Sequence, residues 1–224
     1  LLDSGARSVM VGTRATPEFL SAFPRERLIA ALDFKRGVVM TEGWKTSTGA
    51  SVADKAAVLA PYVGGIIVTA IEIEGSLSGI DLNASRALVE SIRAAGFDGV
   101  LTLAGGVSSA AEVATLDAMG VDAQVGMALY KGVLDPADAF AACLSSDRPD
   151  GLWPTVVCDE SGVALGLAYS DAESLKAAIT ERSGVYRSRR RGLWRKGESS
   201  GDRQTLLRVD ADCDRDALRF TVRQ

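Results

Sequence analysis

The chain contains no histidine, so the side chain that most often carries protons near neutral pH is missing. Acid–base chemistry must therefore use Asp, Glu, Cys, Lys or Tyr, and any metal site must be built from carboxylates and thiolates. Long apolar runs are missing as well: no segment approaches the roughly 20 apolar residues that span a bilayer, and no signal peptide is visible. We expect neither a histidine-based catalytic centre nor a membrane protein.

Cysteine is scarce. Cys143, Cys158 and Cys213 are far apart and odd in number, which fits free thiols or a metal ligand in a reducing compartment better than a disulfide framework. We therefore expect a cytoplasmic protein. The net charge of −4 over 224 residues gives no global basic field, so we expect no nucleic-acid partner. With 47% hydrophobic and 24% charged residues, the composition is that of an ordinary globular protein.

Short apolar segments alternate with helix-like segments from residue 1 to about 144. Four of the helix-like segments open with a residue suited to capping, namely Thr16, Ser51, Ser109 and Asp135. The strands read as continuous apolar runs, as expected when both faces of a parallel sheet are buried. This order predicts an α/β fold, either a barrel or a doubly wound sheet. The predicted strands are 8–12, 28–34, 64–73, 99–106 and 122–130.

Distinctive residues fall at the carboxyl ends of these strands, where such folds carry their chemistry. Asp33 ends the second strand and Thr69 lies near the end of the third. Gly105–Gly106 precedes Ser108 and Ser109, and Gly126 precedes a new helix, so both loops present backbone N–H groups suited to phosphate. A turn-capping role for Asp33 and ordinary tight turns at the glycines are the structural alternatives.

The segments VMVGTRAT, ALDFKRGVVMTEGW, VTAIEIEGSLSGID, LAGGVSS and VGMALYKG resemble the second half of the histidine-biosynthesis barrel ProFAR isomerase. The resemblance covers nearly all of residues 1–144 and implies a partial (β/α)8 TIM barrel made of the C-terminal strands. It implies that Asp33 acts as general acid and that Thr69 assists opening of the ribose ring. No general base is assigned. The substrate-binding residues expected in this part are Trp44, Gly105, Gly106, Gly126 and Met127.

The segment after Thr69 departs from the family pattern. An acidic residue and then Asp-Gly-Thr are usual there, whereas this chain has Ala70 and then Glu74, Gly75 and Ser76. A non-catalytic barrel, acting as a scaffold or as a phosphosugar-binding module, is therefore the alternative for this part.

The alternation of strand-like and helix-like segments stops at LSSDRPDGLWPT, residues 144–155, where Ser, Asp, Pro and Gly cluster as in a linker. We place the domain boundary here, with one domain over 1–144 and a second over 145–224. After the break, the sequence predicts a hairpin that turns at 160–162 and a helix over 171–182. This is an α+β order, unlike that of the first part.

The segment VDADCDRDAL at 209–218 concentrates aspartates. If 208–222 is one extended strand, Asp210, Asp212, Asp214 and Asp216 face one side and Cys213 the other. Adjacent carboxylates repel unless a cation binds them, and Mg²⁺ prefers oxygen ligands, whereas a thiolate favours Zn²⁺. An EF-hand is excluded because the glycine that it requires is replaced by Ala217. A solvated edge strand, with Cys213 as a small buried residue, is the alternative.

The segments DRPDGLWPTVVCDESGVALGLAYS, GVYRSRRRGLWRKGESSGDRQ and DADCDRDALRFTVRQ resemble phosphoribosyl-AMP cyclohydrolase over about 147–224. The resemblance implies hydrolytic opening of the purine ring between N1 and C6. It implies Mg²⁺ on Asp212, Asp214 and Asp216, and Zn²⁺ on Cys213 at a homodimer interface. The segment YRSRRRGLWRKGESSG at 186–201 is rich in Arg and Lys, and a nucleic-acid patch is the alternative for this basic run. The substrate-binding residues implied here are Arg187, Arg189, Trp194 and Lys196.

Both resemblances belong to histidine biosynthesis. We therefore expect part of a fused enzyme: a partial TIM barrel of the ProFAR isomerase type followed by a partial α+β cyclohydrolase domain. Because the chain starts and stops inside predicted elements, we expect it to be a fragment of a longer polypeptide. The expected partners are phosphoribosyl nucleotides and a second copy of the chain.

Overall fold

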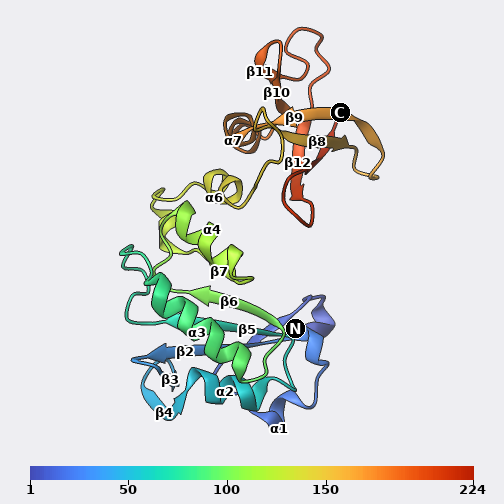
Figure 1. Cartoon of the computed structure of the whole chain (residues 1–224). Coiled ribbons are helices and arrows are strands. Elements are labelled where there is room, and N and C mark those ends of the chain that lie inside the picture. Colours follow the sequence, from blue (N-terminus) through green and yellow to red (C-terminus); the bar gives the residue numbers. More distant parts are fainter. The chain divides into compact units, whose positions relative to one another are not determined.

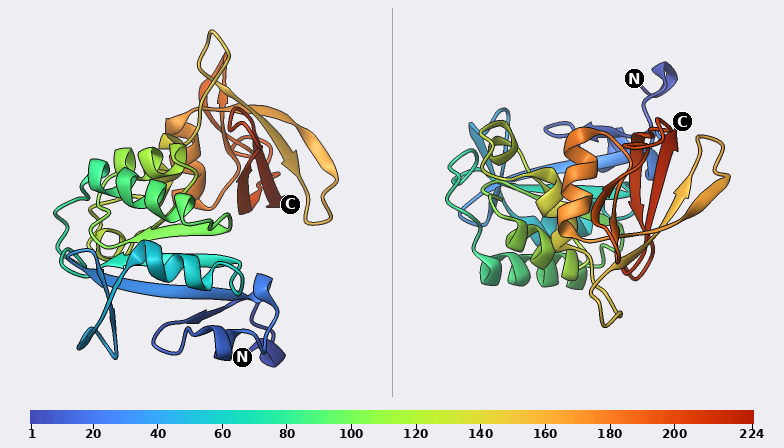
Figure 2. Two further views of the ribbon diagram at one scale, coloured as in Figure 1. Left: turned by 60° about the horizontal axis from the view of Figure 1, so that its bottom comes forward. Right: turned by 90° about the horizontal axis from the view of Figure 1, so that it is seen from above.

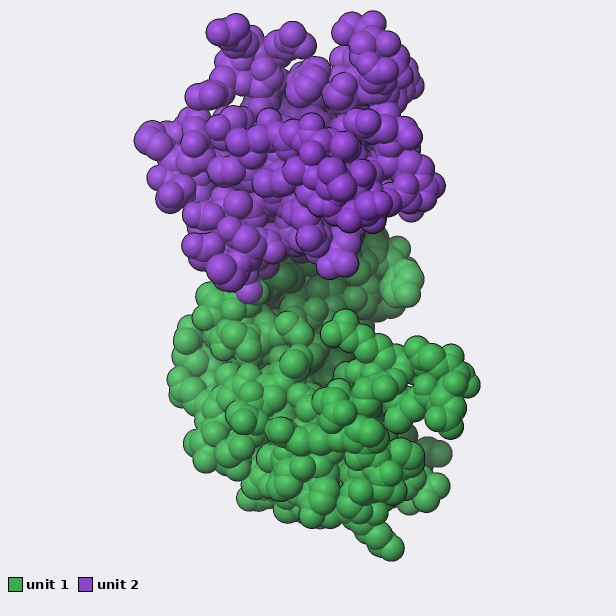
Figure 3. Space-filling model, turned by 90° about the vertical axis from the view of Figure 1, so that its right-hand side faces the viewer, with its two compact units in different colours: residues 1–134 green, residues 135–224 purple.

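A computed structural model describes residues 1–224 as two compact units, Leu1–Leu134 and Asp135–Gln224 (Figure 3). The sequence placed the boundary later, after residue 144. The difference is the short helix α6, Pro136–Ala142, which packs against helix α7, Ala172–Glu181, of the second unit. No helix in either unit is both long enough and apolar enough to cross a membrane.

The first unit is an α/β structure in which strands and helices alternate (Figure 1). The capping residues expected at Thr16, Ser51 and Ser109 all accept a backbone N–H of the following helix. Its strands are β1 (Val9–Val11), β2 (Leu28–Lys35), β3 (Val38–Thr41), β4 (Thr46–Ser51), β5 (Gly65–Ala70), β6 (Val100–Ala104) and β7 (Asp122–Gln124). Its α-helices are α1 (Pro17–Leu20), α2 (Val52–Leu59), α3 (Leu82–Ala94), α4 (Ala110–Ala118) and α5 (Met127–Tyr130), with short 3-10 turns at Leu2–Ser4 and Arg25–Arg27.

One sheet joins all seven strands of this unit in the order β4-β3-β2-β5-β6-β7, with β1 also paired to β2. The strands β1, β2, β5, β6 and β7 run parallel, which is the arrangement of a partial barrel. The hairpin β3–β4 was not predicted, because the polar sequence TSTGAS lacks the apolar character of a buried strand. The predicted strand 122–130 is too long: it ends at Gln124, and Gly126 starts α5.

The core of the first unit lies between the sheet and its helices. Ala30, Ile66 and Leu101 come from three neighbouring strands and are almost fully buried, as are Ala56 of α2 and Leu116 of α4. The expectation of strands buried on both faces is correct for β5, of which Gly65–Val68 is buried throughout. It is wrong for β2, in which buried and partly exposed residues alternate. The partly exposed face of β2 is the one that carries Asp33.

The second unit is α+β (Figures 1 and 2). A four-stranded sheet has the order β12-β13-β8-β9, in which only β13 and β8 are parallel, and β10–β11 forms a separate hairpin. Helix α7 packs on this structure through Leu175 and Ala178, which meet Val185, Phe220 and Val222 in a second core. The predicted hairpin and the predicted helix are confirmed, and Asp171, rather than Ser170, is the residue that caps the helix. The strands are β8 (Trp153–Cys158), β9 (Ala164–Ser170), β10 (Val185–Ser188), β11 (Gly192–Arg195), β12 (Thr205–Ala211) and β13 (Leu218–Arg223).

We predict that Ile66→Ala lowers the free energy of unfolding of the first unit by about 2–5 kcal/mol, because it leaves a cavity at a fully buried position. Val58→Ala, at a position of α2 that is 53% exposed, serves as the control and changes stability by about 0.5 kcal/mol or less. Hydrogen exchange of the β5 amides measures both variants. Equal protection in the two variants would contradict this assignment of the core.

Candidate functional site

The predicted catalytic residues of the first unit lie side by side. Asp33 of β2 is in register with Thr69 of β5, and Thr69 is in register with Ala104 of β6. Residues at one level of adjacent parallel strands point to the same face of the sheet. Asp33 and Thr69 are both partly exposed at the carboxyl ends of their strands, so a ligand can reach both side chains.

Trp44 lies directly against Asp33. The hairpin β3–β4 folds back beside β2, and Trp44 occupies its turn with a left-handed backbone φ of 68°. The indole N–H donates a hydrogen bond to the Asp33 carboxylate, with 2.6 Å between Nε1 and Oδ2, while 47% of the Trp44 surface stays exposed. The unpredicted hairpin is therefore the element that brings a predicted substrate-binding residue to a predicted catalytic one.

The four glycine-loop residues expected to bind substrate line a single pocket. Gly105 and Gly106 follow β6, whereas Gly126 and Met127 form the start of α5. Glycine is required at the first two positions, because their φ angles are 94° and 81° and an added Cβ would lie 2.6 Å from the Ala70 carbonyl or 2.8 Å from the Gly79 carbonyl. A side chain would thus both strain the loop and fill the space beside the pocket.

The N-terminus of α4, expected to offer donors to a phosphate, is occupied by a carboxylate of the chain itself. Glu112 accepts the backbone N–H groups of Ser108 at 2.8 Å and Ser109 at 3.0 Å, and that of Ile80 at 2.8 Å. Partial burial acts to raise the pKa of Glu112, but these hydrogen bonds outweigh it and the pKa is lowered. Glu112 thereby ties the loop after β5, including Gly79, to the start of α4.

The aspartate segment is a hairpin loop and not the extended strand that the sequence predicted. Strand β12 ends at Ala211 and β13 begins at Leu218, so residues 212–217 form the connection. The Asp212 carboxylate accepts the backbone N–H groups of Asp216 at 3.1 Å and Ala217 at 3.2 Å. Strict alternation of side chains therefore stops before Asp212, because this aspartate forms hydrogen bonds within the turn.

The turn nevertheless brings three predicted metal ligands together. Carboxylate oxygens of Asp212, Asp214 and Asp216 all lie within 4.8 Å of one another. Partial burial, and then the charges of Asp214 and Asp212, raise the pKa of Asp216. Asp210 is separate, since Arg208 and Arg219 form ion pairs with it. A cluster of hard oxygen donors fits a cation such as Mg²⁺.

Cys213 provides only part of the ligand set that a zinc ion needs. It is exposed, and its thiol lies 3.9 Å from the Asp214 carboxylate, at the edge of the loop. Cys143 lies at the C-terminus of α6 and Cys158 is buried in β8. Because structural zinc takes four ligands, Cys213 would supply one sulfur to a site whose other ligands come from elsewhere.

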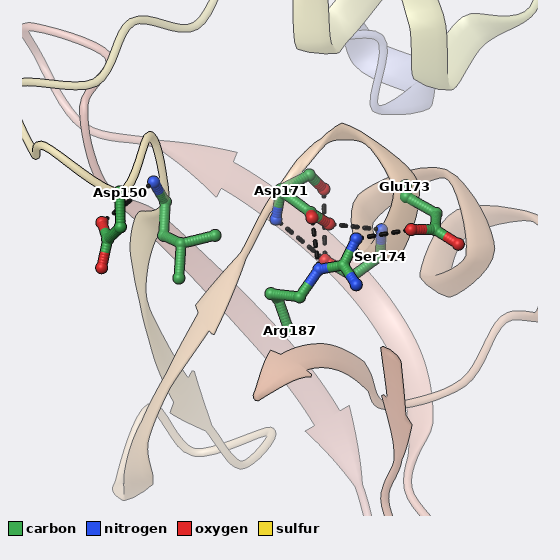
Figure 4. A network of polar contacts seen from close by, with 6 residues as sticks. Asp150, Asp171, Glu173, Ser174 and Arg187 are labelled. Carbon is green, nitrogen blue, oxygen red and sulfur yellow. Dashed lines mark hydrogen bonds and ion pairs between the residues drawn. The ribbon is translucent and has the colours of Figure 1, made fainter. Parts of the chain in front are cut away.

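Arg187, an expected substrate ligand, is engaged within the protein. Figure 4 shows its guanidinium group between the carboxylates of Asp171 and Glu173, with which it forms ion pairs. Asp171 also caps α7 by accepting the N–H of Ser174 at 2.9 Å. Burial acts to raise the pKa of Asp171, but the hydrogen bonds from Ser174 and Arg187 prevail and lower it. Arg187 thus links β10 to the start of α7.

The other three expected substrate residues of the second unit fall into two places. Trp194 and Lys196 line one pocket together with Gly166 and Ala168 of β9. Arg189 lies instead over the ring of Tyr169, 5.2 Å from its centroid. Sequence reasoning missed Tyr169 and its second cationic neighbour, Arg148, although an aromatic residue at a strand end just before a helix cap was a usable signal.

The comparisons with known proteins agree with this arrangement. A family profile described as histidine biosynthesis protein matches residues 1–135, and one described as phosphoribosyl-AMP cyclohydrolase matches residues 166–224. The histidine biosynthesis trifunctional protein of Neurospora crassa is 55% identical over 93 residues, which are 42% of this chain and 11% of that protein. The bifunctional protein his7 of Schizosaccharomyces pombe is 50% identical over 91 residues, 41% of this chain and 22% of its own length.

A further relative is a phosphoribosyl imidazole-4-carboxamide isomerase of Haloquadratum walsbyi, 35% identical over 153 residues, which are 65% of this chain and 60% of that protein. The chain therefore spans only part of each relative that it matches. Its fold defines a partial α/β barrel joined to a small α+β unit. The chain belongs to the histidine biosynthesis protein family, and its second unit carries a cyclohydrolase-type sequence.

We predict that Asp171→Asn lowers the stability of the second unit at pH 7 by about 1 kcal/mol, because asparagine keeps the cap but loses the ion pair in a place that solvent reaches. The folded-state pKa of Asp171 is lowered, so the ionised carboxylate stabilises above the unfolded value near 3.9. The difference from the wild type should therefore shrink as the pH falls below about 4.

Urea unfolding at pH 7 and at acid pH measures this difference. Arg187→Gln and the double variant complete a mutant cycle in which the two losses should be less than additive. Full additivity, or a difference that grows in acid, would contradict the ion pair.

Proposed function

We propose that the second unit catalyses metal-dependent hydrolytic opening of the purine ring of phosphoribosyl-AMP. The observation that carries the proposal is the convergence of Asp212, Asp214 and Asp216, with carboxylate oxygens within 4.8 Å of one another. The cyclohydrolase profile over residues 166–224 supports it independently. Within residues 1–224, which contain no histidine, the carboxylates of this loop and a bound water are the groups that we propose for proton transfer at this site.

Each carboxylate of the loop has its own task in this proposal. Asp212 holds the turn with one oxygen, which accepts the N–H groups of Asp216 and Ala217, and so presents its other oxygen to the cation. Asp214 and Asp216, which lie further along the turn, would bind the same cation with their carboxylates. A bound Mg²⁺ would supply a water of lowered pKa as the nucleophile. Cys213 is proposed as one ligand of a Zn²⁺ ion.

We predict that Asp214→Asn and Asp216→Asn each lower kcat/KM for phosphoribosyl-AMP at least about a hundredfold, because the metal ligands stabilise the charge of the transition state. Magnesium titration should show weaker binding in both variants. The matched control is Asp159→Asn at the β8–β9 turn, where the amide can still accept the N–H groups of Ser161 and Val163. Hydrolysis that survives both loop substitutions, or chelation of the metal, would overturn the proposal.

For the first unit we propose aldose–ketose isomerisation of ProFAR, with Asp33 as the acid and Thr69 beside it. The register of these two residues supports a shared role. The pocket lined by Gly105, Gly106 and Gly126 supports binding of a phosphate through backbone N–H groups other than those of Ser108 and Ser109, which Glu112 already accepts. The Trp44 indole N–H donates to only one oxygen of Asp33, Oδ2, so the proton that Asp33 gives to the ribose ring oxygen would be carried on its other oxygen, Oδ1. In this proposal the exposed ring of Trp44 stacks on the substrate.

We predict that Asp33→Asn lowers isomerase kcat by about 10²–10⁴-fold, as expected for loss of a general acid. Trp44→Phe, which keeps a ring but not the N–H, should change kcat far less. The assay follows ProFAR turnover by the full-length protein. Absence of turnover in the wild type, or turnover that Asp33→Asn leaves unchanged, would instead favour the non-catalytic scaffold or phosphosugar-binding module.

The proposed homodimer involves the second unit. Strand β9 is the last strand of its sheet, and Leu165 and Leu167 on it are 41% and 65% exposed. Val163 just before it is 60% exposed. An apolar strand at a sheet edge is suited to burial against a second copy of the chain. Separately, we propose that the protein is located in the cytoplasm.

A further inference from the structure

The end of the second unit's sheet that holds the aspartate loop also holds an aromatic residue that no family resemblance had assigned. Leu218 of β13, Thr155 of β8 and Ala168 of β9 form one row across the sheet. The aspartate loop immediately precedes Leu218, and Tyr169 immediately follows Ala168. With strands about 4.8 Å apart, Tyr169 is therefore roughly 10 Å from the end of the loop.

Two guanidinium groups share the ring of Tyr169. The central carbon of Arg148 lies 4.8 Å from the ring centroid and that of Arg189 lies 5.2 Å from it, both within the range of a cation–π contact. These arginines come from different elements, since Arg148 lies in the segment before β8 and Arg189 follows β10. One partly buried ring thus collects two positive charges that would otherwise repel each other.

The two arginines differ in how many of their N–H donors remain available to a ligand. Arg148 donates Nε–H and Nη2–H to the Asp150 carboxylate at 2.9 Å each, so its orientation is fixed and its Nη1 stays available. Arg189 is exposed, and its guanidinium forms no hydrogen bond within the chain, so all of its donors are available. A fixed and a free guanidinium group side by side suit the several oxygens of one phosphate.

The segment before β8 connects this cluster to the aspartate loop. Ser145 donates its backbone N–H to the Arg215 carbonyl at 2.9 Å and its hydroxyl to the Asp214 carbonyl at 3.4 Å. Arg148 follows three residues later. The family resemblance already implies that Arg189 binds substrate. We infer that Arg148 joins it over Tyr169 and that the two guanidinium groups together bind a phosphate group of the nucleotide whose base reaches the aspartate loop. The inference rests on the proposed cyclohydrolase function for the identity of that nucleotide.

Calorimetric binding to the full-length protein tests this site with three probes: AMP, ribose 5-phosphate and adenosine. Phosphoribosyl-AMP carries one phosphate on each ribose, so the first two probes represent its two ends. Arg189→Gln and Arg148→Gln should weaken at least one phosphorylated probe about tenfold or more, as expected for a lost charged hydrogen bond, and leave adenosine unchanged. The KM for phosphoribosyl-AMP should rise in parallel, with a much smaller change in kcat.

Matched variants separate a binding role from a structural one. Arg190→Gln removes the same charge from the adjacent exposed position, where no ring contact exists, and should leave affinity near the wild-type value. Tyr169→Phe keeps the ring and should retain binding, whereas Tyr169→Leu should lose it. If Arg148→Gln disturbs folding, Arg189→Gln still decides, because the Arg189 side chain is exposed and makes no hydrogen bond.

The outcomes distinguish this site from the proposed reaction. Phosphate-dependent binding that is lost in Arg189→Gln but kept in Arg190→Gln supports the site even if the wild type does not open the purine ring. Conversely, hydrolysis with a KM that neither Arg148→Gln nor Arg189→Gln alters would overturn the site and leave the reaction standing. A wild type that binds neither phosphorylated probe better than adenosine, or equal losses in Arg189→Gln and Arg190→Gln, would also overturn it.

Discussion

The pairing register of the strands is the constraint on which both candidate sites depend. In the first unit the register places Asp33 beside Thr69 at one level of the sheet. In the second it aligns Leu218, Thr155 and Ala168, and so puts the aspartate loop and Tyr169 at one end. Since a slip by one residue would turn each of these side chains to the opposite face, the buried residues that fix the register also fix the sites.

The two units organise charge in different ways. In the first, the carboxylates near the site already have partners: Asp33 accepts the Trp44 indole N–H, and Glu112 accepts three backbone N–H groups. In the second, carboxylate oxygens of Asp212, Asp214 and Asp216 all lie within 4.8 Å of one another. The first arrangement suits proton transfer and loop positioning, whereas the second suits a divalent cation.

The sequence was sufficient where a local rule determined the structure. Capping residues such as Ser51 and Ser109 marked the helix starts correctly, because a side chain and a nearby N–H decide a cap. The sequence was insufficient where two local preferences, such as strand alternation and a side-chain hydrogen bond within a turn, competed in the same segment. Asp212 alternates with Asp214 as in a strand, but its carboxylate captures two N–H groups and makes a turn. The cluster of Arg148, Tyr169 and Arg189 joins three separate segments, so no window of the sequence contains it.

The hydrogen bonds that Glu112 accepts from Ile80, Ser108 and Ser109 also limit which substitutions the first unit can accommodate. A Cβ at Gly79 would lie 2.5 Å from the Glu112 carboxylate oxygen, and Gly79 has a φ of 82°. A larger residue at Gly79 would displace the carboxylate that orders Ser108 and Ser109, whereas loss of the carboxylate would release the loop that needs the glycine. A substitution at Gly79 or at Glu112 would therefore disturb the other position as well, although Ile80, the neighbour of Gly79, is 32 residues away from Glu112 along the chain.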